Sequence, residues 1–185
     1  MLEDTRASVL VVVDMQNDFI NGILGSEAAQ DIIPDVKKRI EQYNKGDRKI
    51  IFTRDMHDKN SYCFMVESYT VPFHCEYDKP GFAIYPDLVP EMNPNILIVD
   101  KPSFGIDGES WKSYFRDLGF PTDPQSIEIC GLCTDICVVS NALILRSAFP
   151  ETEIIVNSKL CAGTSKEAHD AALKVMSSCC IEVLI

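Results

Sequence analysis

The sequence predicts an α/β fold built around a mostly parallel sheet of six strands. Short apolar runs rich in β-branched residues alternate along the chain with longer segments in which apolar residues recur at helical spacing. The first of these runs is apolar from Val9 to Val13, as in a strand that is buried on both faces of a parallel sheet. No linker, repeat or change in composition divides the 185 residues, so we expect a single domain over residues 1–185.

The N-terminal half contains two strands, one helix and a long irregular segment. The first strand covers residues 8–13 and ends at Asp14, and a helix is expected from residue 27 to residue 44, where apolar side chains follow helical spacing. Residues 49–53 form the second strand, which Asp55 follows closely. From residue 56 to residue 92 the pattern breaks down, and long segments of this kind in compact domains usually carry function. We therefore expect this segment to help to form the site.

The C-terminal half is more regular. A strand is expected at residues 95–99, immediately before Asp100 and Lys101. The elements expected after it are a helix at 109–118, a strand at 126–130, a helix that ends near residue 149, a strand at 152–157, a helix at 165–177 and a strand at 181–184. Parallel strands joined in this way cross over in the right-handed sense.

The charge of the chain narrows the classes of partner. With 28 acidic and 17 basic residues the net charge is -11, so nucleic acids and anionic membranes would be repelled. The partner that we expect is a small neutral or cationic molecule. The first apolar run is too short for a membrane span and does not have the form of a signal peptide, which predicts a cytoplasmic protein.

Eight cysteines are present, and several lie inside apolar strand or helix patterns. In a reducing cytosol we expect free thiols, most of them small core residues. Cys133 and Cys137 are four positions apart, so they do not form the Cys-x-x-Cys motif of redox or zinc sites.

Three reactive residues stand at the carboxyl ends of predicted strands, where ligands bind in sheets of this kind. Asp14 follows the first strand, Lys101 follows the third, and Cys137 lies just past the fourth. A carboxyl group beside a thiol can accept its proton, pass a proton to a leaving amine and then activate water. An ammonium between them would lower the pKa of the thiol and hold the acid in place. Each residue alone also suits a structural role, so their convergence is what predicts an active site.

Cys137 is the expected nucleophile. It falls in the first turn of the helix after residues 126–130, where unpaired N–H groups and the helix dipole favour a thiolate. Cys133 is the rival thiol, but it lies in the preceding turn, whose backbone N–H groups can bind an oxyanion. The turn can therefore supply both a nucleophile and an oxyanion pocket.

A second group of residues, Asp55, His57, Glu67 and His74, has the chemistry of a metal site. Residues two apart in an extended chain face the same way, so Asp55 and His57 can bind one ion together. Two imidazoles with one or two carboxylates suit Zn, Fe or Mn and leave room for water or substrate. The alternative is that the histidines only make polar contacts in a long loop, because their spacing matches no compact zinc motif. His169, in the expected C-terminal helix, is expected to be structural.

Four aromatic residues lie close in sequence to these candidates: Phe19, Tyr69, Phe73 and Phe104. Any of them could line a substrate pocket, although an aromatic side chain belongs more often to the core.

With these residues in place, the sequence resembles the isochorismatase-like cysteine hydrolase superfamily, and within it most closely the nicotinamidases. The resemblance rests on residues 11–19, 53–57, 100–104 and 131–138, which span nearly the whole chain in family order. It implies a doubly wound, Rossmann-like α/β fold with helices on both faces of the sheet, and an Asp14–Lys101–Cys137 triad. It also implies a cis peptide between Leu132 and Cys133, with the amides of Cys133 and Cys137 directed at the oxyanion and Leu132 in the substrate pocket.

The activity implied by the resemblance is hydrolysis of nicotinamide to nicotinic acid and ammonia through a cysteine thioester. Such an enzyme serves NAD salvage, and thus pyridine nucleotide biosynthesis. The implied metal ligands are Asp55, His57 and His74, with Glu67 as a fourth ligand found in some members, and in nicotinamidases the metal site accepts the pyridine nitrogen. Related proteins often form dimers or larger assemblies, so a homo-oligomer is expected.

Two departures from the family pattern concern the substrate. Asp58 replaces a proline that many nicotinamidases carry after the metal histidine of Asp-x-His, and Val71 replaces an aromatic residue three positions before the last metal histidine. Another small amide, a ureide, a carbamoyl compound or the vinyl ether isochorismate are therefore alternative substrates, although isochorismatases proper lack the metal residues. A catalytically silent binding protein of the same fold is the alternative from a different class.

Overall fold

The computed structural model describes residues 8–45 and 48–185. Within these ranges six strands form one sheet in the order β3-β2-β1-β4-β5-β6, and every neighbouring pair is parallel. The strands are β1 Val9–Val13, β2 Lys49–Asp55, β3 Ile96–Lys101, β4 Ser126–Leu132, β5 Glu153–Ala162 and β6 Glu182–Leu184. The predicted α/β fold with a parallel six-stranded sheet is confirmed.

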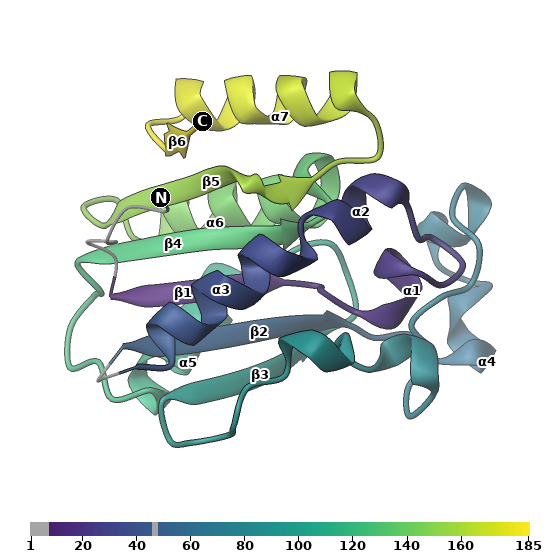
Figure 1. Ribbon diagram of the computed structural model, residues 1–185, viewed down its shortest axis with the longest axis horizontal. Helices are drawn as coiled ribbons and strands as arrows, with labels where there is room; N and C mark the ends of the chain where they lie inside the picture. Colours follow the sequence, from purple (N-terminus) through teal and green to yellow (C-terminus); the bar gives the residue numbers. More distant parts are fainter. Residues whose placement is uncertain (1–7, 46–47) are drawn as a thin grey trace.

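Helices cover both faces of the sheet, as expected for a doubly wound fold. The helices are α1 Asn17–Ile20, α2 Glu27–Asp31, α3 Ile33–Tyr43, α4 Lys59–Tyr62, α5 Gly108–Asp117, α6 Val139–Ala148 and α7 Lys166–Ser178. In Figure 1, α2 and α3 lie over one face of the sheet, and α5 and α6 lie over the other. α7 packs beside α6.

β1 lies at the centre of the core because all of its side chains are apolar. Val9 to Val13 are fully buried between β2 and β4, and β4 is buried at every position. Continuous apolar, β-branched strands of this kind are typical of parallel sheets covered on both faces. The two strands therefore give the loops at their carboxyl ends a rigid base.

The order of the strands reverses between β1 and β4. The chain moves from β1 to β2 and β3 on one side, and then returns to β4 on the other side of β1. In open parallel sheets ligands bind outside the carboxyl ends of the strands at such a reversal. α1, α2 and α4 lie around this carboxyl edge in Figure 1.

The single helix expected over residues 27–44 is in fact two helices. α2 ends at Asp31, and α3 begins at Ile33 with Pro34 in its first turn. Proline fits the first turn of a helix because its missing N–H has no helical partner there, whereas in the interior it would clash with the preceding turn. The break leaves α2 at the carboxyl edge, where Ser26 caps it by accepting a hydrogen bond from the Ala29 N–H at 3.1 Å.

The irregular segment from residue 56 to residue 92 folds over the carboxyl edge as α4 and three short 3-10 turns. A backbone bridge between Gln16 and Ile84 fastens it to the end of β1, and a second bridge, between His57 and Glu76, lies within the segment. The segment therefore lies beside the ends of β1 and β2, where it can contribute to a site.

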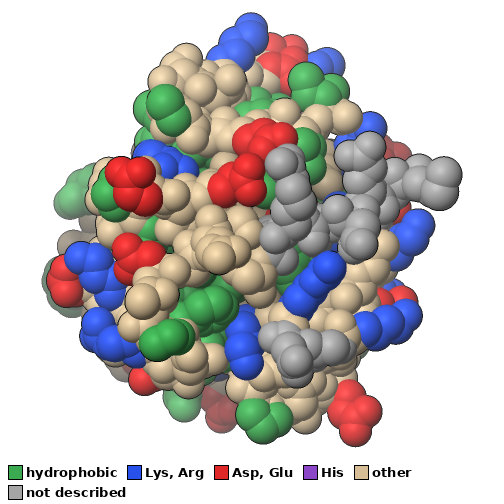
Figure 2. All heavy atoms as spheres, turned by 90° about the vertical axis from the view of Figure 1, so that its left-hand side faces the viewer, with side chains coloured by type: hydrophobic (Ala, Val, Ile, Leu, Met, Phe, Trp, Pro, Cys, Tyr) green, Lys and Arg blue, Asp and Glu red, His purple; other side chains and the backbone are tan. Residues whose placement is uncertain are grey.

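The opposite end of the molecule has a mixed charged surface. Figure 2 shows the side at which the strands begin, with Lys and Arg side chains interspersed among Asp and Glu, and hydrophobic side chains in small groups. No helix in the described part of the chain is both long and apolar enough to cross a membrane. The eight cysteines are free thiols, as expected.

Candidate active site

Three residues from three separate elements meet at the carboxyl edge. Asp14 directly follows β1, Lys101 is the last residue of β3, and Cys137 lies in a π-helical turn, Thr134–Val138, between β4 and α6. Lys101 Nζ is 2.7 Å from Asp14 Oδ2 and 3.5 Å from Cys137 Sγ. All three side chains are buried. The structure thus brings together the three residues that the strand-end rule singled out.

The backbone and one hydroxyl direct Asp14 toward Lys101. Asp14 has a φ of 48°, in the left-handed region, which Asp tolerates better than most residues. The Thr53 hydroxyl on β2 donates a hydrogen bond to Asp14 Oδ1 at 2.6 Å, so the other carboxylate oxygen faces the lysine. Burial opposes the charge on Lys101, but attraction to Asp14 and Cys137 outweighs it and raises the pKa of the lysine.

Burial controls the protonation of the other two groups. It raises the pKa of Asp14 above its ordinary value, although the Lys101 charge opposes the shift. Burial also raises the pKa of the Cys137 thiol well above its ordinary value, and the Asp14 carboxyl adds to the shift. The Lys101 charge lowers the pKa of this thiol, as expected, but burial and the Asp14 carboxyl outweigh it, so the thiolate that the sequence favoured is not the resting form. The thiol keeps its proton, and Asp14, hydrogen-bonded to it, is the group that can accept that proton.

The turn before Cys137 has the backbone form that the family resemblance implied. A cis peptide joins Leu132 to Cys133. The carbonyl oxygen of Cys133 accepts hydrogen bonds from the N–H groups of Ile136 and Val138, both at 3.1 Å, which closes the turn. Burial raises the pKa of the Cys133 thiol to about 12.

Two side-chain contacts tie this turn to the C-terminal part of the fold. Asp135 accepts hydrogen bonds from the backbone N–H and the hydroxyl of Thr164, at 2.8 and 2.5 Å. The hydroxyl of Thr134, a fully buried residue, is hydrogen-bonded to His169 Nδ1 on α7 at 2.8 Å. His169 thus contacts the turn that carries Cys137, which is consistent with the structural role expected for it.

A second cluster, the Asp55, His57, Glu67 and His74 side chains, lies beside Lys101. The ligand atoms of the four residues are all within 4.8 Å of one another. His57 Nε2 is 3.0 Å from Asp55 Oδ2 and 3.8 Å from Glu67 Oε2. His74 Nε2 is 2.9 Å from Asp55 Oδ2 and 3.7 Å from Glu67 Oε1. Donor atoms that share one Zn, Fe or Mn ion are about 3 to 4 Å apart, so these side chains fit one such ion.

The hydrogen bonds of the cluster also suit a cation. His74 Nδ1 lies 2.8 Å from the Pro72 carbonyl oxygen and can only donate to it, so in the neutral ring the Nε2 lone pair faces Asp55. Burial opposes ionisation of Asp55. When a ring nitrogen that faces Asp55 carries a proton instead, it donates to the carboxylate, and these hydrogen bonds with His57 and His74 outweigh burial and lower the pKa of Asp55. A carboxylate and an imidazole lone pair directed at each other form the kind of donor set that a divalent metal binds.

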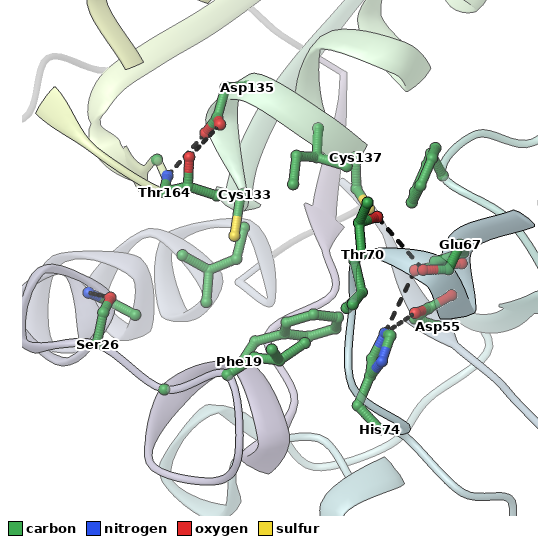
Figure 3. A pocket seen from close by; sticks show the side chains of 18 of the residues that line it. Phe19, Ser26, Asp55, Glu67, Thr70, His74, Cys133, Asp135, Cys137 and Thr164 are labelled. Atoms are coloured by element: carbon green, nitrogen blue, oxygen red, sulfur yellow. Dashed lines mark hydrogen bonds and ion pairs between the residues drawn. The ribbon is translucent and has the colours of Figure 1, made fainter. Parts of the chain in front are cut away.

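A cavity of about 680 Å³ lies next to both clusters (Figure 3). Its wall includes residues of each cluster and three of the expected pocket residues: Cys137, Asp55, Glu67, His74, Phe19, Leu132 and Phe104. The Phe19 ring packs edge-on against the His74 ring, with centroids 5.3 Å apart. The nucleophile candidate and the metal-ligand candidates therefore face one shared space.

Tyr69 and Phe73 lie outside the wall of this cavity. Tyr69 is 78% exposed, and Phe73 packs against Tyr62 with ring centroids 5.3 Å apart. The expectation that either aromatic faces the substrate is wrong for this cavity, and the wall holds Thr70 and Val71 instead. Loop residues carry no periodic pattern, so the sequence did not indicate which side chains of this segment turn inward.

Almost the whole chain matches one known family. The family model for the isochorismatase domain covers residues 8–184. The chain belongs to the isochorismatase family. The resemblance drawn from the four sequence motifs is confirmed, and the family assignment supports a hydrolase. No curated protein sequence matches the chain.

Several solved structures share the isochorismatase-family fold of this chain. It is similar to the nicotinamidase/pyrazinamidase of Bacillus subtilis, with a TM-score of 0.83 and 24% identity over 96% of this chain and 98% of that one. The pyrazinamidase of Pyrococcus horikoshii, in complex with zinc, has a TM-score of 0.80 and 26% identity over 95% and 97% of the two chains. A protein of L. infantum in complex with nicotinate has a TM-score of 0.77 and 18% identity over 100% and 95%.

Two buried amides that the sequence did not single out hold this family site together. Gln16 donates from Nε2 to the Asp55 carbonyl oxygen at 2.9 Å and accepts from the Asp55 N–H at 2.7 Å. Asn141 on α6 donates to the carbonyl oxygens of Cys137 and Phe104, at 2.8 and 3.1 Å. The available signal was a polar residue in an otherwise apolar setting: Gln16 follows a buried strand, and Asn141 lies within an apolar helical run.

Proposed function

We propose that the protein is a metal-dependent amidase that hydrolyses nicotinamide to nicotinic acid and ammonia through a thioester on Cys137, and that it serves NAD salvage. The observation that carries the proposal is the position of Cys137, whose thiol contacts Lys101 and Asp14 and faces the same cavity as the metal-ligand cluster. The fold shared with the Bacillus subtilis nicotinamidase/pyrazinamidase supports it.

In the proposed acylation step, the Cys137 thiol transfers its proton to Asp14 while Sγ forms a bond to the carboxamide carbon. The raised pKa of Asp14 makes it a suitable base for this transfer. The carboxamide oxygen becomes negatively charged and is stabilised by the amides of Cys133 and Cys137. The C–N bond then breaks as Asp14 gives the proton to the nitrogen, and ammonia leaves the acyl group on Cys137.

In the proposed deacylation step, Asp14 accepts a proton from water as the water oxygen bonds to the thioester carbon. The C–S bond breaks, the acid is released, and the proton returns to the Cys137 sulfur. Lys101 remains charged throughout because its pKa is raised. Its contacts at 2.7 Å to Asp14 and 3.5 Å to Cys137 hold both reacting groups and offset the negative charge that passes between them.

A Zn, Fe or Mn ion held by Asp55, His57 and His74, with Glu67 beside them, would act as a Lewis acid toward the ring nitrogen of nicotinamide. The Pyrococcus horikoshii pyrazinamidase, which shares the fold, was solved with zinc. Phe19, which packs on His74, offers an apolar wall to the ring.

The presence of Val71 in the cavity wall favours one rival, a hydrolase of the same fold that acts on another small amide, ureide or carbamoyl compound. An aliphatic side chain there cannot stack on a pyridine ring. A binding protein without activity is the remaining alternative.

Ammonia release from nicotinamide tests the proposal. The protein loaded with Zn, Fe or Mn should release ammonia and nicotinic acid, and exhaustive chelation should lower the rate by at least about 100-fold, because outer-shell ligands alone are worth 10- to 100-fold. Re-addition of the metal should restore it. Release that chelation does not change would contradict the metal role, and no release from any small amide would favour a binding protein.

The metal content of two histidine variants tests whether the ion binds at the proposed cluster. His74→Ala should lose most of the bound metal, measured by elemental analysis of the purified protein. The matched variant His169→Ala removes a histidine that hydrogen-bonds to Thr134 rather than to the cluster, and should keep its metal. Equal metal content in the two variants would show that the ion binds elsewhere.

A further inference from the structure

The cavity extends beyond the residues that the proposed reaction uses. Its outer part is formed by Leu24, Ser26 and Ala29 around the start of α2, and by Asp135 and Thr164 from the turns before α6 and α7. We propose, on the basis of the amidase function above, that the preferred substrates are primary carboxamides larger than nicotinamide. Their acyl group carries an apolar, uncharged or cationic extension that occupies this outer part.

The size of the cavity is the first argument. About 680 Å³ lies in the range of pockets that enclose drug-sized ligands. Nicotinamide is a single six-membered ring with one carboxamide, and between Cys137 and His74 it fills only the inner part. Figure 3 shows Ser26, Asp135 and Thr164 at the other end of the cavity from His74.

The position of Asp14 fixes the side of the substrate that can be extended. Asp14 is fully buried, forms no part of the cavity wall, and lies behind Cys137 in contact with Lys101 and Thr53. The amide nitrogen must face Asp14 to receive its proton as it leaves. A substituent on that nitrogen would meet the closed side of the site, so the leaving group is ammonia and the extension belongs to the acyl side.

The chemistry of the outer part sets the character of the extension. Leu24 and Ala29 give it apolar surface, and both carboxylate oxygens of Asp135 already accept hydrogen bonds from Thr164. Within the described residues the wall of the whole cavity holds no Lys or Arg, while Asp55, Glu67 and Asp135 contribute carboxyl groups. An apolar chain or ring is therefore favoured there, and a carboxylate on the extension is repelled.

Local hydrogen bonds show that the outer part is built in advance of binding. Ser26 caps α2 at 3.1 Å, and the two Asp135–Thr164 hydrogen bonds join the turn before α6 to the turn before α7. A preformed wall loses little conformational freedom when a ligand fills it. The contacts of the extension can therefore strengthen binding of the transition state, because little of their free energy is lost in ordering the wall.

Steady-state kinetics with a matched set of amides tests the inference. The set is nicotinamide, nicotinamides with a propyl or phenyl group on ring carbon 5 or 6, and the same compounds with a terminal carboxylate. For at least one neutral extended amide, kcat/KM should exceed that of nicotinamide by about tenfold or more, since one methylene in an apolar pocket is worth 10- to 200-fold. The carboxylate partner of that amide should be at least about tenfold poorer than the neutral compound.

A side chain that fills the outer part gives the second readout. Leu24→Trp should lower the ratio of kcat/KM for the extended amide to kcat/KM for nicotinamide by about tenfold or more. Val175→Trp introduces the same side chain at an exposed position of α7 outside the cavity wall, and should leave both values unchanged. If Leu24→Trp does not fold, the ratio of kcat/KM for the extended amide to kcat/KM for nicotinamide, measured on the wild-type protein, still tests the inference.

The outcomes separate this inference from the proposed function. If nicotinamide is hydrolysed and no extended amide exceeds it in kcat/KM, the inference is overturned and the amidase function still stands. An unchanged ratio in a folded Leu24→Trp variant would overturn it as well. Failure to hydrolyse any amide of the set would overturn the amidase function itself, and the inference with it.

Discussion

At the scale of single residues, the site distinguishes two thiols that are one turn apart. The Cys137 sulfur is 3.5 Å from Lys101 Nζ and is hydrogen-bonded to Asp14, so it has both a base and a cation beside it. Burial raises the pKa of Cys133 to about 12, and the next contribution comes from Asp135, whose negative charge also opposes ionisation. Of these two thiols, Cys137 is therefore the one with a hydrogen-bonded carboxyl group that can accept its proton.

Substitution of each thiol tests this distinction. Cys137→Ala should abolish turnover, because it removes the thiol that is hydrogen-bonded to Asp14. The loss should reach at least about 1000-fold, as for other nucleophile deletions. Cys133→Ala keeps the backbone amide and should retain substantial activity. The measurement is ammonia release, with mass spectrometry of a rapidly quenched sample to detect an acyl group on Cys137. The reverse pattern of activities would identify Cys133 as the nucleophile.

The sequence predicted the placement of Asp14, Lys101 and Cys137 because strand ends converge at one edge whatever the loops do. It did not predict the protonation of Cys137. The helix terminus favours a thiolate, but the resting pKa depends on burial, and burial is a property of the packed fold rather than of a local pattern. The expectation that Tyr69 or Phe73 lines the pocket was wrong for a related reason. A loop has no periodic pattern that shows which of its side chains face inward.

At the scale of elements, the turn after β4 is constrained by the strand beside it. Gly131 pairs with Val13 of β1 and has a φ of +119°. A Cβ at this position would lie 2.1 Å from the Val13 carbonyl oxygen. Glycine is thus required both by the backbone conformation and by the close approach of β1.

Gly131→Ala should lower the free energy of unfolding by at least about 3 kcal/mol, because backbone strain and a steric clash in the core each cost about 1 to 3 kcal/mol. Gly119→Ala is the matched control, since Gly119 has a φ of +85° but nothing within 4 Å of the added Cβ. It should show the strain alone, about 1 to 2 kcal/mol. Urea denaturation of both variants measures the difference, and equal losses would show that β1 can move away without cost.

The contact between Thr134 and His169 is a second property of this turn. Thr134→Val preserves the shape of the buried side chain but removes the 2.8 Å hydrogen bond to α7. We expect kcat to fall by about tenfold while KM changes less, because a small displacement of the turn misplaces Cys137 relative to the bound amide. Thr134→Ser retains the hydroxyl and should recover most of the kcat. A Val variant with normal kcat and only a lower melting temperature would limit this contact to stability.

Element boundaries were predicted where one physical pattern ran through the whole element. α7 was expected at residues 165–177 and is Lys166–Ser178, because its capping serine and its apolar spacing agree. β5 was expected to end at Asn157 but continues to Ala162, and its register with β4 shifts between Ile129 and Gly131. Pairing with a neighbouring strand extends β5 through polar residues, which no pattern within the segment itself could indicate.

At the scale of the whole molecule, a buried ion pair joins a helix layer to the sheet. Arg39 on α3 lies 3.2 Å from Glu128 on β4, and the Tyr43 hydroxyl donates to the same carboxylate at 2.8 Å. The Arg39 and Glu128 side chains are only 2% and 0% exposed. Neither residue belongs to the wall of the cavity. The fold therefore has a charged contact in its core that is separate from the proposed chemistry.

Removal of one partner should destabilise the fold without changing the reaction. Arg39→Met leaves the buried Glu128 carboxylate without the cation that stabilises it most. We expect a loss of about 3 kcal/mol in the free energy of unfolding, with kcat/KM retained in the remaining folded protein. In Arg39→Met with Glu128→Gln, the neutral amide removes the buried charge, so part of the stability should return.

The pH dependence of this loss follows from the pKa of Glu128. Burial already raises that pKa above its ordinary value of 4.5, and Arg39 opposes the shift, so Arg39→Met raises the folded-state pKa further. Such a carboxyl group binds its proton more tightly in the folded state than in the unfolded state. Its contribution to stability is therefore fully present below the unfolded pKa and is lost as the pH rises through the folded pKa. The deficit of Arg39→Met relative to wild type should therefore be smallest near pH 4.5 and grow toward neutral pH, as urea denaturation across that range can show. A deficit that does not change with pH would mean that Glu128 carries no buried charge.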